Sequence, residues 1–326
     1  MKTQGLLAPQ YRDEDAAREH IEKIRWPDGP VCPHCGSVNE ASKIHAQPDS
    51  KSPVRKGVWY CRDCEKQFTV TVGSIFEDSH IPLHKWLLAI HLMLSSKKGV
   101  SAHQLMRNLE IGSYRSAWFM AHRIRWALTQ EPVKGLFGGT VEIDETYIGG
   151  KFRVGPQADK PGERPKDRLA HVANKAAVVS VLQRGGSVRS YHVEKVTAKN
   201  LRPIVDEMVS QDAHLMTDTS TVLKSAGGKR KLSQVNHTEK EYVRYESGEK
   251  ITTNSVEGYF SILKRGNIGI YHHWSKKYMG QYLREFDWRY NARRLPDMER
   301  TVVALRMTGG KRLMLKTPIS EKRRDN

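Results

Sequence analysis

The chain has 326 residues, a formal net charge of +18 and a hydrophobic content of 38%, so it is long enough for two or three domains with real cores. It contains no run of about 18 apolar residues, and its first residues lack an apolar signal segment, so we expect neither a membrane span nor a secretory leader. We therefore expect a cytosolic protein whose thiols are reduced.

The excess of lysine and arginine points to a polyanionic partner. The 54 basic residues outnumber the 36 acidic residues, and basic side chains that meet phosphates release condensed counterions. This charge favours a nucleic acid as the partner. A basic protein that binds ribosomes, or one that is simply soluble, is the alternative.

The first part of the chain predicts a polar helix, then hairpins that carry the cysteines, then a helical region. The hairpins lie between about residues 30 and 75, where QFTVTV (67–72) alternates like a strand. The helices are predicted over residues 12–25, 83–94, 101–109 and 113–128. Short breaks between the last three give a rhythm like that of a helix-turn-helix.

The helix over residues 113–128 mixes basic and aromatic side chains. Its basic residues are Arg115, His122, Arg123 and Arg125. Such a mixture suits a helix that faces phosphates, and it equally suits a core helix with a solvated basic edge. The spacing of these residues leaves both readings open.

After Gly138 and Gly139 the pattern changes from helices to strands. Strands, one helix and a further strand are predicted in order over residues 140–150, 176–183, 188–196, 197–210 (the helix) and 213–219. This order predicts a mixed α/β sheet. A loop rich in proline, glycine and charge is expected over residues 152–170, and a long helix over residues 275–294.

All four cysteines of the chain belong to two CxxC pairs, Cys32 with Cys35 and Cys61 with Cys64. Each CxxC turn presents two thiolates, and a tetrahedral Zn²⁺ ion binds four. Two disulfides fit poorly with a cytosolic chain, and a redox CxxC motif would occur once, near a βαβ unit. The spacing therefore predicts a structural zinc site of the ribbon type, in which His34 takes no part.

Two acidic residues lie on predicted strands, where ligands can be exposed. Asp144 lies in the middle of VEIDETY and shares a strand face with Glu142, opposite Val141 and Ile143. Asp218 ends the short strand HLMTD, and strand ends expose ligands in open α/β sheets. An acidic residue on a strand is most often only part of a solvated face.

A third acid, Glu257, lies near the start of a predicted helix. Asn254 and Glu257 fit a capping box, in which the glutamate only completes the helix start. Glu257 also shares a helix edge with Ser261 and Lys264, beside an apolar face, so an acid and a base stack there.

Carboxylates that converge from separate elements suit phosphodiester chemistry. Two Mg²⁺ ions about 4 Å apart activate the attacking oxygen and stabilise the leaving oxygen. Mg²⁺ takes oxygen ligands and keeps water or phosphate oxygens for its remaining positions. A lysine nearby would steady a DNA phosphate. In a chain of charge +18, the acids would hold cations and the surrounding bases would hold DNA.

Over nearly its whole length the chain resembles the zinc-ribbon DDE transposases of bacterial insertion sequences. The N-terminal part of the resemblance is carried by CPHCGS, WYCRDCEKQFTVTVGSIFEDSHIPLHKWLLAI and SYRSAWFMAHRIRWAL. The remainder is carried in order by VEIDETYIGGK, LMTDTS, VNHTEKEYV and TNSVEGYFSILKRGNIGIYHHWSKKYMGQYLREFDWRYNAR. These strings are long and specific.

The resemblance implies a ribonuclease H-like catalytic domain with an acidic triad. The triad carries over to Asp144, Asp218 and Glu257 as ligands of two Mg²⁺ or Mn²⁺ ions, and the family's lysine carries over to Lys264. Glu145 is expected on the opposite strand face and is left out of the site. His237 matches a histidine of the family pattern, and a structural role is expected for it.

The domains that follow from this resemblance are four. They are an N-terminal helix and zinc ribbon (1–82), a helical DNA-binding module (83–135), a ribonuclease H-like catalytic domain (136–300) and a basic tail (301–326). The fold class expected is therefore multidomain α/β, with a ribbon, a helix-turn-helix-like linker domain and a mixed α/β catalytic domain.

The activity implied is that of a bacterial, cytoplasmic and nucleoid-associated transposase. It would bind the terminal inverted repeats of its own element, hydrolyse a strand at each end and join the 3′-OH to target DNA. Its partners would be double-stranded DNA and a second protomer or more, with no membrane. A ribonuclease H-like nuclease or resolvase, and a domesticated zinc-dependent DNA-binding protein without catalysis, are the alternatives.

Overall fold

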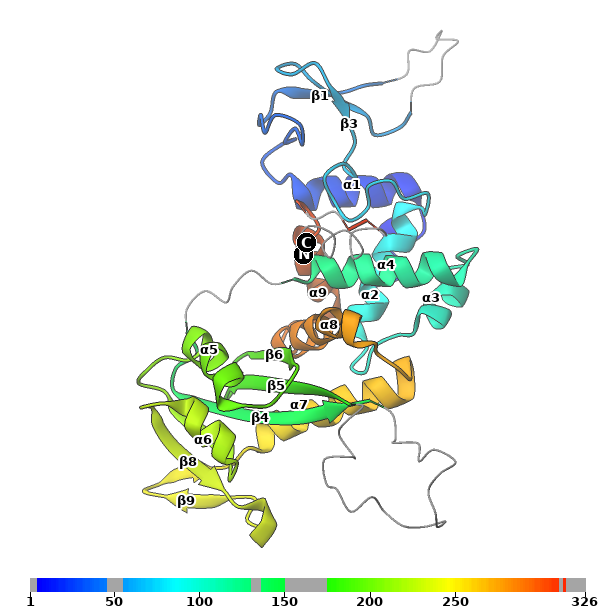
Figure 1. The fold of residues 1–326 in the computed structure, drawn as a ribbon. Coiled ribbons are helices and arrows are strands. Elements are labelled where there is room, and N and C mark those ends of the chain that lie inside the picture. The colour runs from blue at the N-terminus through cyan, green and yellow to red at the C-terminus, as the bar shows by residue number, and fades with distance from the viewer. Residues whose placement is uncertain (1–4, 46–54, 130–135, 150–174, 311–312, 315–326) are drawn as a thin grey trace, which may run out of the picture. The chain divides into compact units, whose positions relative to one another are not determined.

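The computed structural model describes residues 5–45, 55–129, 136–149, 175–310 and 313–314 (Figure 1). The loop predicted over residues 152–170, and the tail from residue 315, lie outside this part. The chain divides into two compact units, residues 1–129 with 294–326, and residues 130–293. Along the described ranges, no helix combines the length and the apolar character that crossing a bilayer requires.

Unit 1 begins with a helix and a small antiparallel sheet. The sheet has the order β1-β2-β3, with bounds Ala41–Lys43, Trp59–Cys61 and Gln67–Phe68. Cys32, Cys61 and Phe68 form its buried centre, against Trp26 and Trp59. The strand predicted over residues 67–72 is therefore only partly confirmed, because the backbone turns after Phe68, where the Val72 amide bonds to the Thr69 carbonyl.

The rest of unit 1 is helical, and the predicted helices are confirmed. Their bounds are Glu14–Arg25 (α1), Leu83–Ser95 (α2), Ala102–Asn108 (α3) and Tyr114–Ala127 (α4), after a short 3-10 turn, Pro9–Tyr11 (η1). Asp13 caps α1 by accepting a hydrogen bond from the Ala16 amide at 2.7 Å. Ser101 and Ser113 cap α3 and α4 in the same way.

Helix α4 is a core helix over most of its length. His122, Arg123 and Arg125 are buried, whereas Arg115 is exposed. The Arg123 guanidinium lies over the rings of Trp86 and Phe119, so its positive charge makes cation–π contacts inside the unit. The reading in which these basic residues face phosphates is therefore wrong for the buried three, because their side chains pack within unit 1.

The last helix of unit 1 was not predicted from the sequence. Helix α9 (Asp297–Arg306) packs against α2 and α1, and Thr301 on α9 is hydrogen-bonded to His91 on α2 at 3.1 Å. Residues 294–310 therefore fold with the N-terminal unit, whereas the sequence placed a domain boundary at residue 300 and a tail after it. The reason that these residues fold with unit 1 is apolar burial: Leu305 is fully buried there, and a free tail would expose it to water.

Unit 2 is built on a five-stranded mixed sheet. The strand order is β6-β5-β4-β7-β8, with bounds Val188–Val193, Ala176–Gln183, Thr140–Ile148, His214–Asp218 and Lys231–Val235. The pairs β6-β5 and β5-β4 are antiparallel, and the pairs β4-β7 and β7-β8 are parallel. The mixed α/β sheet predicted from the sequence is confirmed, and β4 is its central strand.

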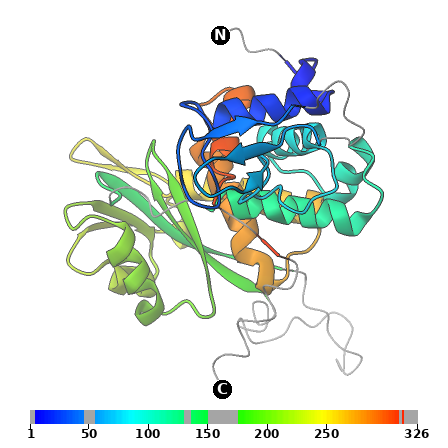
Figure 2. The same ribbon diagram turned by 90° about the horizontal axis from the view of Figure 1, so that it is seen from above.

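Helices cover both faces of this sheet (Figures 1 and 2). Val141 and Ile143 of β4 face the cluster that includes α5 (Ala198–Met208) and α6 (Thr221–Gly227). The opposite face packs on α7 (Asn254–Gly266) and α8 (Met279–Asn291). Glu142 and Asp144 therefore point toward the α7 side, as the alternation of β4 predicted.

Short elements complete unit 2. They are a 3-10 turn at His237–Glu239 (η3), a hairpin of Arg244–Glu246 (β9) and Glu249–Ile251 (β10), a π-helical turn at Asn267–Tyr271 (η4) and a 3-10 turn at Lys276–Tyr278 (η5). The sequence did not predict the hairpin, β8 or α6. The hairpin and η3 lie between β8 and α7, next to the start of α7 in sequence.

The packing of α9 gives a direct test of its place in the fold. Leu305→Ala should lower the free energy of unfolding by about 2–5 kcal/mol, because it leaves a cavity at a position of 0% exposure. Arg306→Ala, at the exposed neighbouring residue, should change it by less than about 0.5 kcal/mol. Chemical denaturation measures both, and equal stability of the two variants would mean that α9 is a loose tail.

Candidate active site and metal centres

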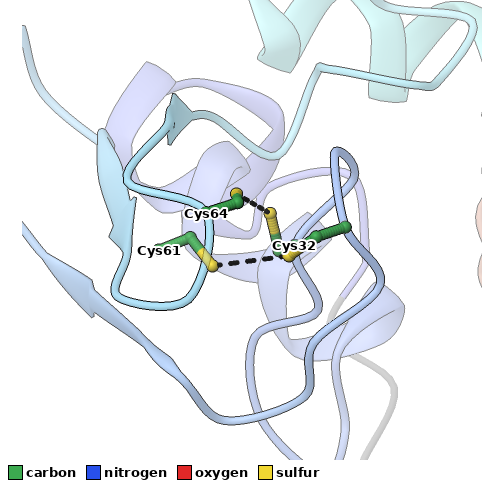
Figure 3. Close-up of side chains that lie close together, drawn as sticks. Cys32, Cys61 and Cys64 are labelled. Carbon is green, nitrogen blue, oxygen red and sulfur yellow. Dashed lines mark hydrogen bonds between the residues drawn. The ribbon is translucent and has the colours of Figure 1, made fainter.

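The four cysteines come together in the ribbon of unit 1 (Figure 3). Their sulfur atoms all lie within 4.8 Å of one another, and the Cys32–Cys64 and Cys35–Cys61 sulfur pairs are both 3.6 Å apart. A disulfide bond would need about 2.05 Å. Zinc–sulfur bonds of about 2.3 Å in a tetrahedron place sulfurs about 3.8 Å apart. The cluster therefore fits a Zn²⁺ ion, as the spacing predicted.

The surroundings of the thiols shift their pKa values in opposite directions. A hydrogen bond from the Ser37 hydroxyl lowers the pKa of Cys35 to about 6, whereas burial raises the pKa of Cys64 to about 12. A divalent ion would deprotonate both, because metal-bound thiols are thiolates. His34 is no member of the cluster; its Nε2 lies 3.3 Å from the Gln67 carbonyl oxygen.

In unit 2, the register of two parallel strands brings two predicted acids together. Glu142 on β4 is paired with Met216 on β7. Two residues further along each strand lie Asp144 and Asp218, on the same face of the sheet. Asp218 is the last residue of β7, where its carboxylate accepts a hydrogen bond from the Ser220 amide at 3.0 Å.

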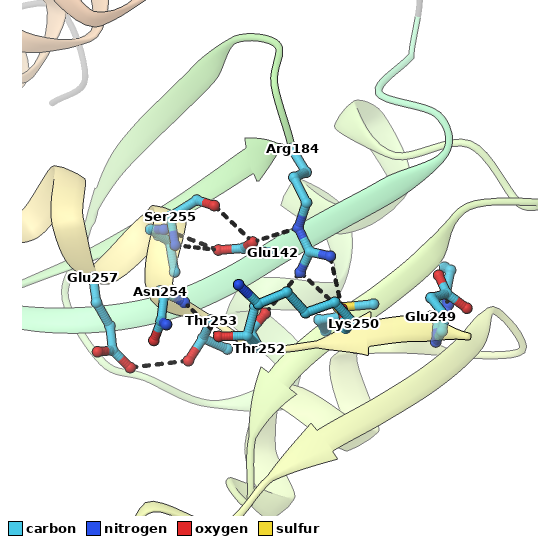
Figure 4. A network of polar contacts seen from close by, with 12 residues as sticks. Glu142, Arg184, Glu249, Lys250, Thr252, Thr253, Asn254, Ser255 and Glu257 are labelled. Atoms are coloured by element: carbon cyan, nitrogen blue, oxygen red, sulfur yellow. Dashed lines mark hydrogen bonds and ion pairs between the residues drawn. The ribbon is translucent and has the colours of Figure 1, made fainter. Parts of the chain in front are cut away.

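The third acid, Glu257, comes from the first turn of α7 (Figure 4). The capping box predicted for it is wrong, because the helix N-cap is Thr253 rather than Asn254 and no cap bond is made by its side chain. Glu257 Oε1 instead accepts a hydrogen bond from the Thr253 hydroxyl at 2.9 Å. His237 Nε2 lies 2.9 Å from the same oxygen. His237 therefore touches a predicted site residue.

The negative charges of other acids act on Asp144. Burial raises the pKa of Asp144 to about 7, and the negative charges of Glu145, Asp218 and Glu257 add to the rise. Asp144 and Asp218 lie on the face of the sheet that carries Glu142, and Glu142 accepts a hydrogen bond from the Val256 amide, directly before Glu257 on α7. Lys264 is exposed two turns beyond Glu257 on α7.

Glu145, next to Asp144 in the chain, is electrostatically coupled to the predicted acids. Burial and the charge of Asp218 raise its pKa to about 6, and its Oε2 is buried without a hydrogen-bond partner. By the alternation of β4 (Thr140–Ile148), Glu145 lies on the face of Ile143 and Tyr147, opposite Asp144, as the sequence predicted.

The region fits divalent cations through its donor chemistry. It offers carboxylate oxygens, which are the ligand type that Mg²⁺ and Mn²⁺ prefer, with the His237 imidazole beside Glu257. The raised pKa of Asp144 is an unfavourable feature that a nearby cation would relieve. Among the described residues, only the four cysteines gather three or more ligand atoms within 4.8 Å, so the acids surround a wider space.

Comparison with known proteins matches both units of the chain. The family described as "ISXO2-like transposase domain" matches residues 136–291, and the family described as "Transposase zinc-ribbon domain" matches residues 12–67. A protein of Halobacterium salinarum, described as "Uncharacterized protein in transposable element ISH50", is 25% identical over 304 residues, which span 89% of this chain and 95% of that protein.

A solved structure described as "Crystal structure of a pre-cleavage Mos1 transpososome" is also similar. It is 12% identical, covers 70% of this chain and 80% of its own, and superposes with a TM-score of 0.19. At this TM-score nothing about the fold is concluded from the likeness.

The sulfur cluster predicts how the ribbon depends on zinc. Cys61→Ser should lower the bound zinc from about one ion per chain to nearly none and should unfold the ribbon, because a structural site needs all four thiolates. His34→Ala is the matched control and should keep its zinc. Metal analysis with circular dichroism measures both, and a Cys61→Ser protein with full zinc would contradict the assignment.

The raised pKa of Asp144 predicts a pH-dependent stability. The folded protein binds this proton more tightly than the unfolded chain does, so stability is lost as the pH rises from about 4 toward 7. In zinc-loaded, magnesium-free protein at pH 8, Asp144→Asn should raise the free energy of unfolding by about 1–3 kcal/mol. At pH 4 the gain should vanish.

Asp212 provides the matched control for that measurement. It is exposed, and a hydrogen bond from the Ser210 hydroxyl lowers its pKa, so Asp212→Asn should bring no gain at pH 8. Denaturant titration at the two pH values gives all four differences. An Asp144→Asn protein that is no more stable than wild type at pH 8 would show that the region holds no strained carboxylate.

Proposed function

We propose, from the premise that the chain belongs to the zinc-ribbon transposases of insertion sequences, that it cuts its element's ends and joins them to target DNA. The observation that carries this proposal is geometric: the register of β4 with β7 puts Asp144 and Asp218 on one face of the sheet, and Glu142 on that face holds the first turn of α7, which carries Glu257. We also propose that unit 2 is ribonuclease H-like, which its mixed sheet supports.

Asp144, Asp218 and Glu257 are the proposed ligands of two Mg²⁺ or Mn²⁺ ions. When bound, such ions would activate an attacking oxygen and stabilise the leaving oxygen of a phosphodiester. His237 and Thr253 hold Glu257 Oε1, which fixes the orientation of the carboxylate. Lys264, exposed on the same helix, would pair with a DNA phosphate.

The remaining roles follow from charge and from the division of the chain. The net charge of +18 supports binding of double-stranded DNA at the element's ends and at the target. We assign DNA contacts to the ribbon and the helical region, and the stability of the ribbon to Zn²⁺. Because an element has two ends, we propose that at least two protomers act together on DNA, in the bacterial cytoplasm.

The sharpest test compares Glu257→Gln with wild type on a labelled duplex that carries the element's own ends. With Mg²⁺ or Mn²⁺, nicking by the variant should fall by about 10²–10³-fold or more, because one carboxylate of the cation site is lost. DNA affinity should stay the same. Glu246→Gln is the matched control, an exposed glutamate on β9, and should nick like wild type.

Each other outcome selects a different function. Equal nicking by Glu257→Gln and wild type would reduce Glu257 to a structural residue. Nicking without transfer of the 3′-OH into a plasmid would make the protein a nuclease or resolvase. Tight DNA binding without any nicking by wild type would make it a DNA-binding protein without catalysis.

A further inference from the structure

The helix that carries Glu257 does not cap itself. Thr253 is its N-cap and makes no side-chain cap bond, although the first amides of any helix lack partners within the helix. A carboxylate from the sheet supplies the partner. Glu142 Oε2 accepts hydrogen bonds from the Ser255 amide at 2.9 Å and the Val256 amide at 3.0 Å (Figure 4).

Glu142 is fully buried, and its carboxylate is fully used. Its Oε1 accepts hydrogen bonds from the Ser255 hydroxyl and from Arg184 Nε, both at 2.9 Å. Each oxygen thus accepts two hydrogen bonds, which is the full capacity of a carboxylate. The charge of Arg184 and the positive end of the helix compensate the buried negative charge.

Arg184 ties the same carboxylate to the segment that precedes the helix. Its guanidinium donates to the carbonyl oxygens of Lys250 at 2.8 Å and Thr252 at 2.9 Å. Its Nη2 also lies 2.9 Å from the Met216 sulfur on β7. The pair of Glu142 and Arg184, which we call the clamp, therefore joins β4, β7 and the entry into α7.

The clamp contacts the close sequence neighbours of two proposed cation ligands, Asp144 and Glu257. Glu142 precedes Asp144 by two residues on the same face of β4, and Val256 directly precedes Glu257 on α7. Because the Glu142 side chain binds the Val256 amide, it sets the position of Glu257 relative to Asp144. Cation sites need such precision, because their ligands must be held to within about 0.5 Å.

We propose that Glu142, paired with Arg184, is the positioning residue of the cation site: it holds the first turn of α7 on β4 and so places Glu257 opposite Asp144. This inference rests on the proposed function, in which these acids bind Mg²⁺ or Mn²⁺. Glu142 has no lone pair left for a cation itself, which separates its role from that of Asp144.

The competing explanation is that Glu142 only stabilises the fold. Asp287 offers a matched control for that explanation, because it is also a buried carboxylate of unit 2. It accepts hydrogen bonds from the Ser190 amide at 2.8 Å and from the Tyr259 hydroxyl at 2.6 Å, and so holds α8, β6 and the middle of α7. It does not touch the first turn of α7.

The experiment measures Mn²⁺ binding by zinc-loaded protein, without DNA, for wild type, Glu142→Gln and Asp287→Asn. Asp218→Asn lacks one proposed ligand, so the Mn²⁺ binding that it loses is the binding that depends on the acidic site. The carboxamide of Glu142→Gln cannot accept four hydrogen bonds, so its Mn²⁺ affinity should fall by about 10–100-fold. Asp287→Asn should keep the wild-type affinity, although both variants should unfold at lower temperature than wild type.

Amide hydrogen exchange is a second measurement. If Glu142 only stabilised the fold, its loss would not selectively speed exchange in the first turn of α7. The amides of Ser255 and Val256 should exchange faster in Glu142→Gln than in Asp287→Asn. If Glu142→Gln fails to fold, Ser255→Ala serves in its place, because it removes only the hydroxyl bond to Glu142. It should weaken Mn²⁺ binding by about 2–5-fold, in line with the loss of one hydrogen bond.

The outcomes separate this inference from the proposed function. Equal Mn²⁺ affinity of Glu142→Gln and wild type, or equal weakening in both buried-acid variants, would overturn the positioning role. Absence of Asp218-dependent Mn²⁺ binding in wild type would overturn it as well. Mn²⁺ binding that depends on Asp218 and on Glu142, in a protein that never nicks DNA, would leave the positioning role standing and overturn the proposed function.

Discussion

The parallel pairing of β4 with β7 is the constraint on which the rest of unit 2 depends. Its register places Asp144 beside Asp218, and the alternation of β4 separates its two faces, an apolar one toward α5 and α6 and an acidic one toward α7. A shift of one residue in this register would turn Asp144 into the apolar cluster. The long antiparallel pairing of β4 with β5 holds the register in place.

Glu142 and Asp144 lie on the same face of β4 but differ in how well their carboxylates are hydrogen-bonded. Glu142 accepts four hydrogen bonds, so its burial is compensated. Among the residues that the structure describes, Asp144 accepts one hydrogen bond, from the Glu145 amide at 2.8 Å, and its pKa is raised to about 7 by burial and by the charges of Glu145, Asp218 and Glu257. Structural ion pairs are completed within a protein, whereas a concentration of uncompensated acids is typical of a functional site. This contrast separates a residue that positions the site from one that forms it.

The sequence predicted the ribbon, most helices and the mixed sheet, because these depend on local patterns such as the CxxC spacing and the alternation of β4. It predicted the three acids through resemblance, and their convergence follows from strand register. It missed α9, since a helix of ten residues near the chain end has a weak pattern. It misread the basic side chains of α4, and it assigned Glu257 a cap that Glu142 provides, because tertiary contacts decide both.

The central claim is that Asp144, Asp218 and Glu257 hold divalent cations in one site. Crystals of the zinc-loaded protein in Mn²⁺, measured at the manganese absorption edge, test it most directly. The account predicts anomalous density between these three carboxylates, in addition to the zinc peak at the cysteines, and loss of that density in Asp218→Asn. Saturating Mn²⁺ that gives density elsewhere on the protein and none between the three acids would contradict it.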